Sequence, residues 1–178
     1  MAESRFRHFL KYVVIDILLA ALISFFLINY VVSAFKIEGD SMKPLLCAQE
    51  RILISKLAVR KNSLRRFDIV VLYKPDEPDK SLVKRIIGLP GEIIEIRAGD
   101  VYINDKLLKQ LPGGGDADAA KSPADMKALL IPRGTFFVMG DNRSISFDSR
   151  LFGPVPQKYI FGKAFFRYWP PAAMGKIE

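Results

Sequence analysis

The chain has 178 residues, of which 50% are hydrophobic and 26% are charged, so it is long enough for one globular domain and too apolar for a disordered chain. Lysine and arginine outnumber aspartate and glutamate by 27 to 19, and the net charge of +8 suits an anionic membrane surface or a nucleic acid. The single cysteine, Cys47, and the single histidine, His8, exclude an intramolecular disulfide and any metal site built from several such residues.

An apolar run from Tyr12 to Phe35 is the first long feature. It contains 24 residues, 20 of them apolar. As a helix at ~1.5 Å per residue it spans about 36 Å, enough to cross a ~30 Å hydrocarbon core. A cleavable secretory signal is the alternative, but the run is much longer than the ~7–15 residue core of such a signal. We therefore predict a retained transmembrane anchor at residues 12–35.

Basic residues flank this run unevenly. Arg5, Arg7 and Lys11 precede it, whereas Lys36 and Lys43 follow it. By the positive-inside rule this weak bias puts the N-terminus in the cytoplasm. We predict a single-pass protein of the cell (inner) membrane, with a cytoplasmic segment at residues 1–11 and an extracytoplasmic domain at residues 36–178.

Short β-branched and aromatic runs replace the long apolar segment after residue 50. Turn residues separate them, and Asn104-Asp105 predicts a tight hairpin over residues 101–108. Without long amphipathic helices between them, such runs are typical of an all-β domain. Residues 110–125 are rich in Gly, Ala and Asp, which predicts a mobile surface loop. The runs are Arg51–Lys56, Asp68–Tyr73, Leu82–Ile87, Glu92–Ile96, Val101–Ile103, Thr135–Met139 and Tyr159–Tyr168.

A basic stretch at residues 56–66 is the feature most typical of nucleic-acid binding. It contains Lys56, Arg60, Lys61, Arg65 and Arg66, but no aromatic residue alternates with them to stack on bases. No recognition helix is evident either. We therefore expect no nucleic acid as a partner, and interpret the stretch as a solvated loop or as a contact with membrane phospholipid headgroups.

Ser41 is the candidate nucleophile. It lies in Gly39–Pro44 (GDSMKP), six residues after the predicted anchor. A turn of this kind can present a hydroxyl and backbone N–H groups, although most such serines only cap or turn the chain. A serine nucleophile needs a base, and the single histidine, His8, is predicted on the other side of the membrane. The base must then be an aspartate, a glutamate or a lysine.

Lys84 is the candidate base. Strand alternation puts it on one face with Leu82 and Ile86. If that face is the core, burial favours the neutral amine and lowers its pKa from ~10.4 toward the ~7–8 that suits a general base. The alternative is that Lys84 faces water on an edge strand, and this segment alone favours that alternative.

A dense polar segment at residues 140–150 (GDNRSISFDSR) follows a predicted apolar strand. Within it, Asp148 and Arg150 can pair as opposite charges, and Ser146 can donate or accept a hydrogen bond. Taken by itself, the segment is typical of a polar surface loop.

Together the anchor and these three segments resemble the bacterial type I signal peptidases, which are membrane-anchored serine-lysine endopeptidases. The resemblance implies an all-β catalytic fold of antiparallel sheets, preceded by one N-terminal transmembrane helix. It implies removal of N-terminal signal peptides from exported preproteins after Ala-x-Ala-like sites, with no metal and no other cofactor. The matching motifs, in the family's order, are Gly39–Pro44, Arg66–Val71, Val83–Gly91, Met139–Arg143 and Asp148–Arg150.

The resemblance also implies a role for each matched position. Ser41 is expected to be the nucleophile, with its backbone N–H helping to bind the oxyanion, and Lys84 the general base. Ser146 is expected to hold the Lys84 amine in place, while Asp148 and Arg150 form a supporting ion pair. The residues expected to line substrate pockets for small side chains are Phe35, Ile37, Met42 and Val83.

Two features depart from the family pattern. Gly39 stands where some members have a serine whose hydroxyl joins the oxyanion hole, and the short segment between Gly91 and Gly140 implies a small accessory insert at about residues 97–134. Two rival functions stay open: a self-cleaving Ser-Lys peptidase, and a non-catalytic membrane-tethered β-domain that binds a protein partner. The second rival predicts that replacing Ser41 or Lys84 leaves function intact.

Overall fold

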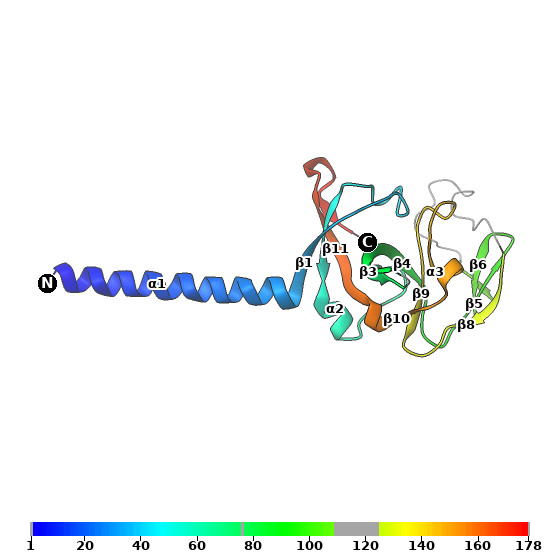
Figure 1. Ribbon diagram of the computed structural model, residues 1–178, viewed down its shortest axis with the longest axis horizontal. Helices are drawn as coiled ribbons and strands as arrows, with labels where there is room; N and C mark the ends of the chain where they lie inside the picture. The colour runs from blue at the N-terminus through cyan, green and yellow to red at the C-terminus, as the bar shows by residue number, and fades with distance from the viewer. Residues whose placement is uncertain (1, 76, 109–124, 178) are drawn as a thin grey trace.

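A long N-terminal helix projects away from a β-sheet domain in the computed structural model (Figure 1). The structure describes residues 2–75, 77–108 and 125–177. Helix α1 (Ala2–Phe26) continues into a π-helical turn, η1 (Leu27–Val31), and the stretch from Leu10 to Val31 is long and apolar enough to cross a membrane. None of the residues in its most apolar part is buried inside the protein.

The helix ends four residues before the predicted end of the anchor. Val32 has an extended backbone, with φ −130° and ψ 145°. Strand β1 (Val32–Lys36) pairs with strand β2 (Arg51–Ser55), from Val32 opposite Ser55 to Lys36 opposite Arg51. Strand β2 supplies hydrogen-bond partners for the backbone N–H and C=O groups of β1. An apolar run without such a neighbour can pair these groups only within a helix. The span predicted at residues 12–35 is therefore too long by its last four residues.

Eight strands form the main sheet, and every pairing in it is antiparallel. Besides β1 and β2 these are β3 (Ile69–Lys74), β4 (Glu77–Gly88), β9 (Thr135–Met139), β10 (Val155–Pro156), β11 (Ile160–Trp169) and β12 (Gly175–Lys176). Their order is β1-β2-β11-β3-β4-β9-β10, with β12 beside β11. Strand β4 therefore lies inside the sheet, between β3 and β9.

A second, four-stranded sheet forms the end of the domain farthest from the helix (Figure 1). Its strands are β5 (Ile93–Arg97), β6 (Asp100–Ile103), β7 (Lys106–Leu107) and β8 (Met126–Leu130), in the order β7-β6-β5-β8. The predicted hairpin is confirmed, because β6 pairs with β7 through Asn104 and Asp105, whose φ angles of 49° and 61° suit a two-residue turn. The sheet begins four residues before the expected start of the accessory insert at residue 97. The loop predicted at residues 110–125 lies outside the described residues, apart from Asp125.

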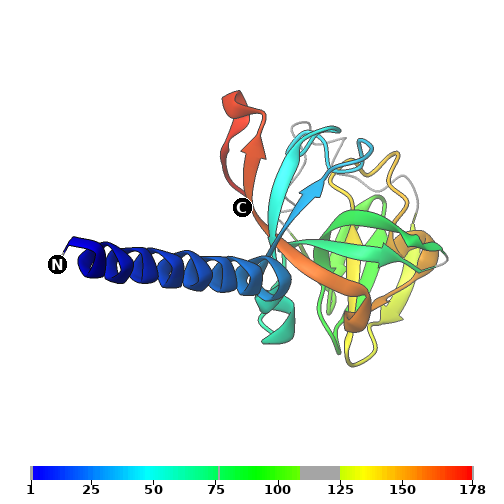
Figure 2. The same cartoon turned by 60° about the vertical axis from the view of Figure 1, so that its left-hand side comes forward.

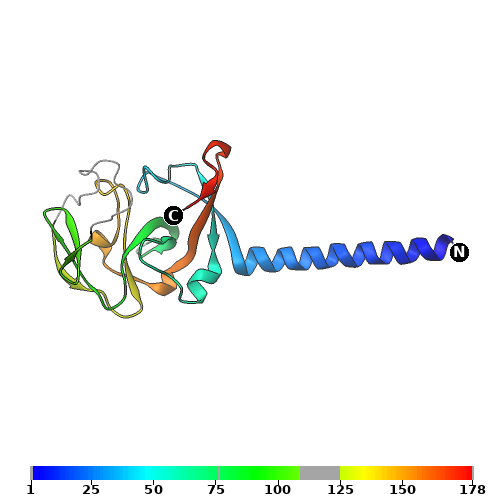
Figure 3. The same cartoon turned by 180° about the vertical axis from the view of Figure 1, so that it is seen from behind.

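Four short helices complete the described part of the domain. They are α2 (Lys56–Arg60), α3 (Ser149–Phe152), η2 (Gln157–Tyr159) and η3 (Pro171–Ala173). Helix α2 replaces the first half of the loop predicted at residues 56–66, because Ser55 caps it by accepting a hydrogen bond from the Ala58 N–H at 3.4 Å. Figures 2 and 3 show α2 beside the point where the long helix enters the domain.

Buried apolar side chains form three clusters between these elements. The cluster nearest the helix, here called the first cluster, contains Ile37, Met42, Ile52 and Val83 among others. The second lies under the smaller sheet, and the third lies where β3, β4 and β9 meet β10 and β11. The antiparallel β domain behind one N-terminal apolar helix confirms the predicted fold class.

Candidate active site

The turn that follows β1 presents Ser41. Gly39 has φ +81°, a left-handed conformation that glycine adopts at no steric cost. The side chain of Met42 is buried in the first cluster, and the Met42 carbonyl accepts a hydrogen bond from the Leu46 N–H at 2.9 Å. These contacts fix the backbone on both sides of Ser41, whose side chain is half-buried.

Lys84 lies within hydrogen-bond distance of the Ser41 hydroxyl. Its Nζ is 2.7 Å from Ser41 Oγ, although 43 positions separate the two residues in the sequence. Lys84 comes from the C-terminal half of β4 and is 2% exposed. The alternative that Lys84 faces water on an edge strand is therefore wrong.

Burial lowers the pKa of the Lys84 amine from 10.5 to about 8. Loss of hydration is the largest cause, because it disfavours the charged form. The Arg150 guanidinium acts in the same direction, whereas the carboxylates of Asp148 and Asp141 oppose the shift. An amine with this pKa is partly neutral near pH 7, so it can accept a proton from the hydroxyl that it contacts.

The expected ion pair between Asp148 and Arg150 is bidentate. Arg150 Nε donates to Asp148 Oδ1 at 2.8 Å, Arg150 Nη2 donates to Oδ2 at 2.9 Å, and the Gly140 N–H donates to Oδ2 at 3.0 Å. Burial by itself raises the pKa of the Asp148 carboxyl, but these hydrogen bonds outweigh burial and lower it. Arg150 also donates to the Arg143 carbonyl at 2.8 Å, so the pair braces the 140–150 loop internally.

Ser146 lies in the same loop, but the predicted hydrogen bond to the Lys84 amine is not formed. Its Oγ is buried and makes no well-formed hydrogen bond among the described residues, although Ser146 lies close enough to the Asp148 carboxyl to help lower the pKa of that group. A β-carbon placed on Gly140 would lie 2.3 Å from Ser146 Oγ and 2.5 Å from the Ser41 carbonyl oxygen. The Asn142 N–H also donates to that carbonyl at 3.0 Å. The absence of a side chain at Gly140 therefore lets the loop close onto the Ser41 turn.

Sequence reasoning missed a second buried ion pair. Arg85 donates from Nε and Nη2 to Asp141 at 2.9 and 2.8 Å, and each residue is 1% exposed. Arg143 is buried beside this pair, and burial lowers the pKa of its guanidinium to about 10. Both ends of the ion pair lie in quoted motifs, but 56 positions separate them and no sequence pattern joins them.

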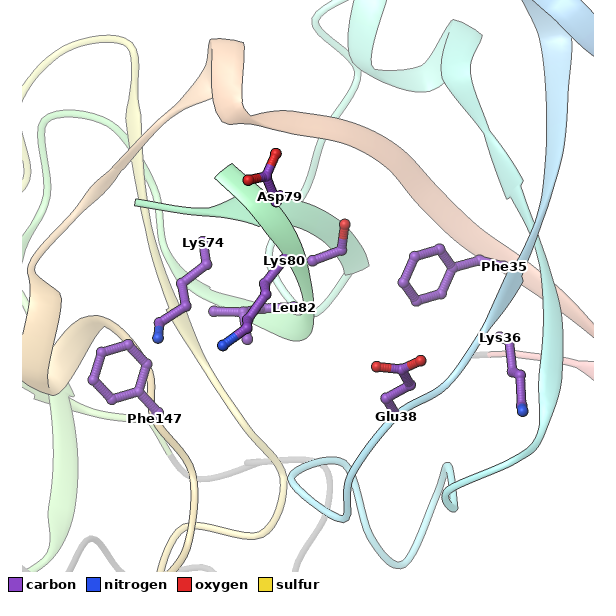
Figure 4. Close-up of a pocket in the computed structure, with 9 residues that line it drawn as sticks. Phe35, Lys36, Glu38, Lys74, Asp79, Lys80, Leu82 and Phe147 are labelled. Carbon is purple, nitrogen blue, oxygen red and sulfur yellow. The ribbon is translucent and has the colours of Figure 1, made fainter. Parts of the chain in front are cut away.

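An open cavity of about 600 Å³ lies between β1 and β4. Its lining residues include Glu38, three positions before Ser41, and Leu82, two positions before Lys84, but neither Ser41 nor Lys84 itself. Figure 4 shows Phe35 and Glu38 on one side of it, and Lys80 and Leu82 on the other. The Lys74 ammonium lies 5.0 Å from the centre of the Phe147 ring, and the two side chains complete the wall on the β4 side (Figure 4). Charged residues thus make up much of a wall that was expected to be apolar.

Only one of the four predicted pocket residues lines this cavity in the described parts of the chain. Phe35 does so, packed on the edge of the first cluster. Ile37 and Met42 are 1% exposed and Val83 is 6% exposed, so these three belong to the core beneath the cavity. The sequence shows that they are apolar but does not show how deep they lie.

The arrangement supplies a nucleophile, a base and a substrate-sized groove from protein groups. Within residues 2–75, 77–108 and 125–177, no group of three or more His, Cys, Asp or Glu side chains is placed to hold a metal ion. The Lys84 amine is the titratable group in contact with the Ser41 hydroxyl. This geometry suits acyl transfer through a serine.

Comparisons with known proteins point in the same direction. A family model described as "Signal peptidase, peptidase S26" matches residues 9–169, which include the Ser41 turn, β4 and the 140–150 loop. Signal peptidase I V of Bacillus subtilis (strain 168) is 39% identical over 143 residues, which cover 75% of this chain and 84% of that protein. Signal peptidase IB of Staphylococcus aureus (strain Mu50 / ATCC 700699) is 34% identical over 170 residues, 88% of each chain. A crystal structure of a signal peptidase I from Enterococcus faecalis V583 aligns with a TM-score of 0.49 and 34% identity, over 56% of this chain and 95% of that one.

Proposed function

Because this chain belongs to the signal peptidase family, peptidase S26, we propose that it cleaves exported preproteins with Ser41 as nucleophile and Lys84 as general base. Membership in the family makes the chain a serine endopeptidase that removes signal peptides. The residues that carry the reaction, the sequence that is cut and the placement in a membrane are the proposal. The 2.7 Å contact between Ser41 Oγ and the buried Lys84 amine is the observation that carries it.

The reaction begins when the neutral Lys84 amine takes the proton of the Ser41 hydroxyl. Ser41 Oγ then bonds to the carbonyl carbon of the scissile peptide, and the Ser41 backbone N–H helps to bind the oxyanion. Lys84 gives its proton to the leaving amine as the C–N bond breaks, which leaves an acyl-enzyme. Lys84 then takes a proton from a water molecule, and the hydroxide adds to the acyl carbon. As the C–O bond to Ser41 breaks, Lys84 returns the proton to Ser41 Oγ and the signal peptide is released.

The 140–150 loop supports the two reacting groups. The Asp148–Arg150 ion pair holds the loop, and Gly140 brings the Ser146 hydroxyl close to the Ser41 turn. A buried hydroxyl that lacks a well-formed hydrogen bond can change partner, here from the neighbourhood of Asp148 to the Lys84 amine, at little cost. We assign Ser146 to orient the Lys84 amine after Lys84 has given up its bond to Ser41.

The substrate occupies the groove between β1 and β4 as an extended strand. In that conformation alternate side chains point to opposite faces. Two side chains then face the floor above Ile37 and Val83, which is already filled and leaves room only for small groups. This favours cleavage after Ala-x-Ala-like sequences, with the middle residue turned toward Phe147 and Lys74 on the β4 side.

The helix from Leu10 to Val31 anchors the protein in the cell membrane. No residue in its most apolar part is buried inside the protein, and the basic residues before it favour a cytoplasmic N-terminus. Membrane phospholipid is then a direct neighbour of the chain. Protease added to spheroplasts should digest the β domain, and protection until the membrane is lysed would overturn this orientation.

The assignment of the two reacting residues is tested by incubating the full chain in detergent with a preprotein. Ser41→Ala and Lys84→Arg should each lower cleavage by more than about a thousandfold, since guanidinium does not give up its proton in this range. Ser63→Ala and Lys127→Arg are the matched controls, because both residues are exposed and outside the groove. Near-normal cleavage by Ser41→Ala would exclude Ser41 as the nucleophile, and absence of cleavage by the wild type would favour a non-catalytic, partner-binding domain. Cleavage of the chain itself without cleavage of the preprotein would favour a self-cleaving peptidase.

A further inference from the structure

A second cavity, of about 490 Å³, lies at the joint between the long helix and the β domain. Its apolar lining includes Ile54, Val59, Ile160 and Phe161. Its charged lining consists, among the described residues, of Lys56 and Arg60, which are both basic and both on α2. The wall of the cavity therefore combines an apolar part, formed by these side chains, with a polar part that carries two positive charges and no described negative charge.

Two contacts fix the position of this cavity along the axis of the long helix. Lys56 Nζ donates to the carbonyls of Ile28 and Asn29 at 3.4 and 3.0 Å. The Arg60 guanidinium lies 5.5 Å from the centre of the Tyr30 ring. All three helix residues belong to the last turns of the stretch Leu10–Val31, whose 22 residues span about 33 Å, close to the thickness of a hydrocarbon core. The two cations therefore lie at the depth of the outer lipid headgroups, provided that the helix spans the membrane as proposed above.

The charges of Lys56 and Arg60 are not neutralised by nearby carboxylates. In the described ranges of the chain, neither forms an ion pair. Lys56 uses its donors on helix carbonyls, which carry no full charge, and Arg60 has five N–H donors available to a planar or tetrahedral anion. Two exposed cations on the same basic stretch, Lys61 and Arg65, add to the positive field.

We propose that this cavity binds one anionic phospholipid of the outer leaflet. Its phosphate lies between Lys56 and Arg60, and the first part of an acyl chain enters past Val59 and Phe161. A headgroup phosphate matches the charges, and an acyl chain matches the apolar interior, which a free anion would leave empty. The inference rests on the proposed membrane placement but not on the catalytic roles of Ser41 and Lys84.

The cavity also shares a wall with the substrate groove. Phe35 lines both cavities, and its ring lies 6.3 Å from that of Phe161, which in turn lies 4.5 Å from that of Tyr73. A lipid in the cavity therefore touches the back of the aromatic wall whose front faces the substrate. Both the bound lipid and the substrate then lie against the same side chain at the membrane surface.

Native mass spectrometry of the full chain in maltoside micelles tests the proposal directly. Phosphatidylglycerol is the probe, and phosphatidylcholine is the uncharged comparison. The wild type should retain one phosphatidylglycerol at least about tenfold more tightly than phosphatidylcholine. Lys56→Gln combined with Arg60→Gln should weaken retention by about 30-fold, since each cation near an anionic lipid contributes roughly fivefold. Lys127→Gln removes one positive charge from the distant β8 and should change nothing.

Two further arms separate this site from a general charge effect and from a site for free phosphate. Ser33→Leu narrows the cavity and keeps both cations, so it should also lose the bound lipid. A large excess of inorganic phosphate should not displace the lipid. Thermal unfolding midpoints close to that of the wild type check that each variant is folded. Wild-type retention by the double variant or by Ser33→Leu, equal binding of phosphatidylcholine, or displacement by phosphate would each overturn the proposal. Cleavage of a preprotein, measured in parallel, reports separately on the proposed function.

Discussion

The pH dependence of cleavage follows from the burial of Lys84. With a pKa of about 8, roughly a tenth of the Lys84 amines are neutral at pH 7 and about nine-tenths at pH 9. If the neutral amine is the base, kcat/KM should rise about tenfold between these pH values and level off above them. A lysine with the ordinary pKa of 10.5 would instead give a rise of about a hundredfold over the same interval, without a plateau.

The assay is the initial rate of cleavage of a preprotein by the full chain in neutral detergent, at constant ionic strength, from pH 6 to 10. The inflection of the pH profile is assigned to Lys84 if a substitution near Lys84 shifts it. The Asp148 carboxylate raises the Lys84 pKa, so Asp148→Asn should move the inflection to lower pH as well as reduce the maximal rate. Asp105→Asn removes a carboxylate from the distant hairpin turn and should leave the inflection where it is.

Three results would refute this reasoning. An inflection above pH 10 in the wild type would mean that burial does not lower the pKa of the base. An inflection near pH 8 that ignores Asp148→Asn would mean that a group other than Lys84 is titrating. A wild-type rate that falls as pH rises through 8 would require the protonated amine, and would exclude Lys84 as the base.

Three further outcomes are expected. Lys84→Met should abolish cleavage and, at pH 7, raise the free energy of unfolding by up to about 3 kcal/mol, because a folded-state pKa lowered from 10.5 to about 8 disfavours folding below pH 8. Between pH 8 and 10.5 Lys84 is protonated in the unfolded chain but neutral in the folded one. The free energy of unfolding of the wild type should therefore rise with pH over this range, which chemical denaturation at several pH values can measure. Gly140→Ala should abolish cleavage or folding, since the added β-carbon would lie 2.3 Å from Ser146 Oγ. Gly175→Ala is the control, because a β-carbon there meets no atom within 4 Å and should have no effect. Equal effects of the two substitutions would contradict this reasoning. Ile37→Ala should lower the free energy of unfolding by about 2–5 kcal/mol, as for a core residue, and a loss below 1 kcal/mol would show that the site is not packed.

The parts of the fold with local signals were predictable from the sequence. The apolar run, the alternating strands and the Asn104-Asp105 turn each depend on neighbouring residues, and the structure has a helix, strands and a hairpin there. The boundary between helix and strand was not predictable in this way. Residues 32–35 are apolar enough to extend the helix, and only the distant partner β2 draws them into a sheet.

The extent to which individual residues are buried was the main property that could not be predicted from the sequence. Alternation predicts one buried face for β4, yet every residue from Val83 to Gly88 is buried. Strand β4 is covered on both faces, because Val83 and Ile87 pack in the first and second clusters and Ile86 packs in the third. Packing within the first cluster also hides Ile37 and Met42 in the core, where sequence reasoning expected pocket walls.

The low pKa of Lys84 depends on the way in which its charged neighbours pair with one another. Two carboxylates, Asp141 and Asp148, are close enough to raise that pKa, and a count of nearby charges would predict a protonated lysine. Each carboxylate, however, is already held by two hydrogen bonds from its own arginine, Arg85 or Arg150. A carboxylate paired in this way stabilises a buried ammonium less than a free carboxylate would, and the Arg150 guanidinium acts against it. Loss of hydration then decides the protonation state, and the ion pairs that stabilise the loop also keep the base neutral enough to act.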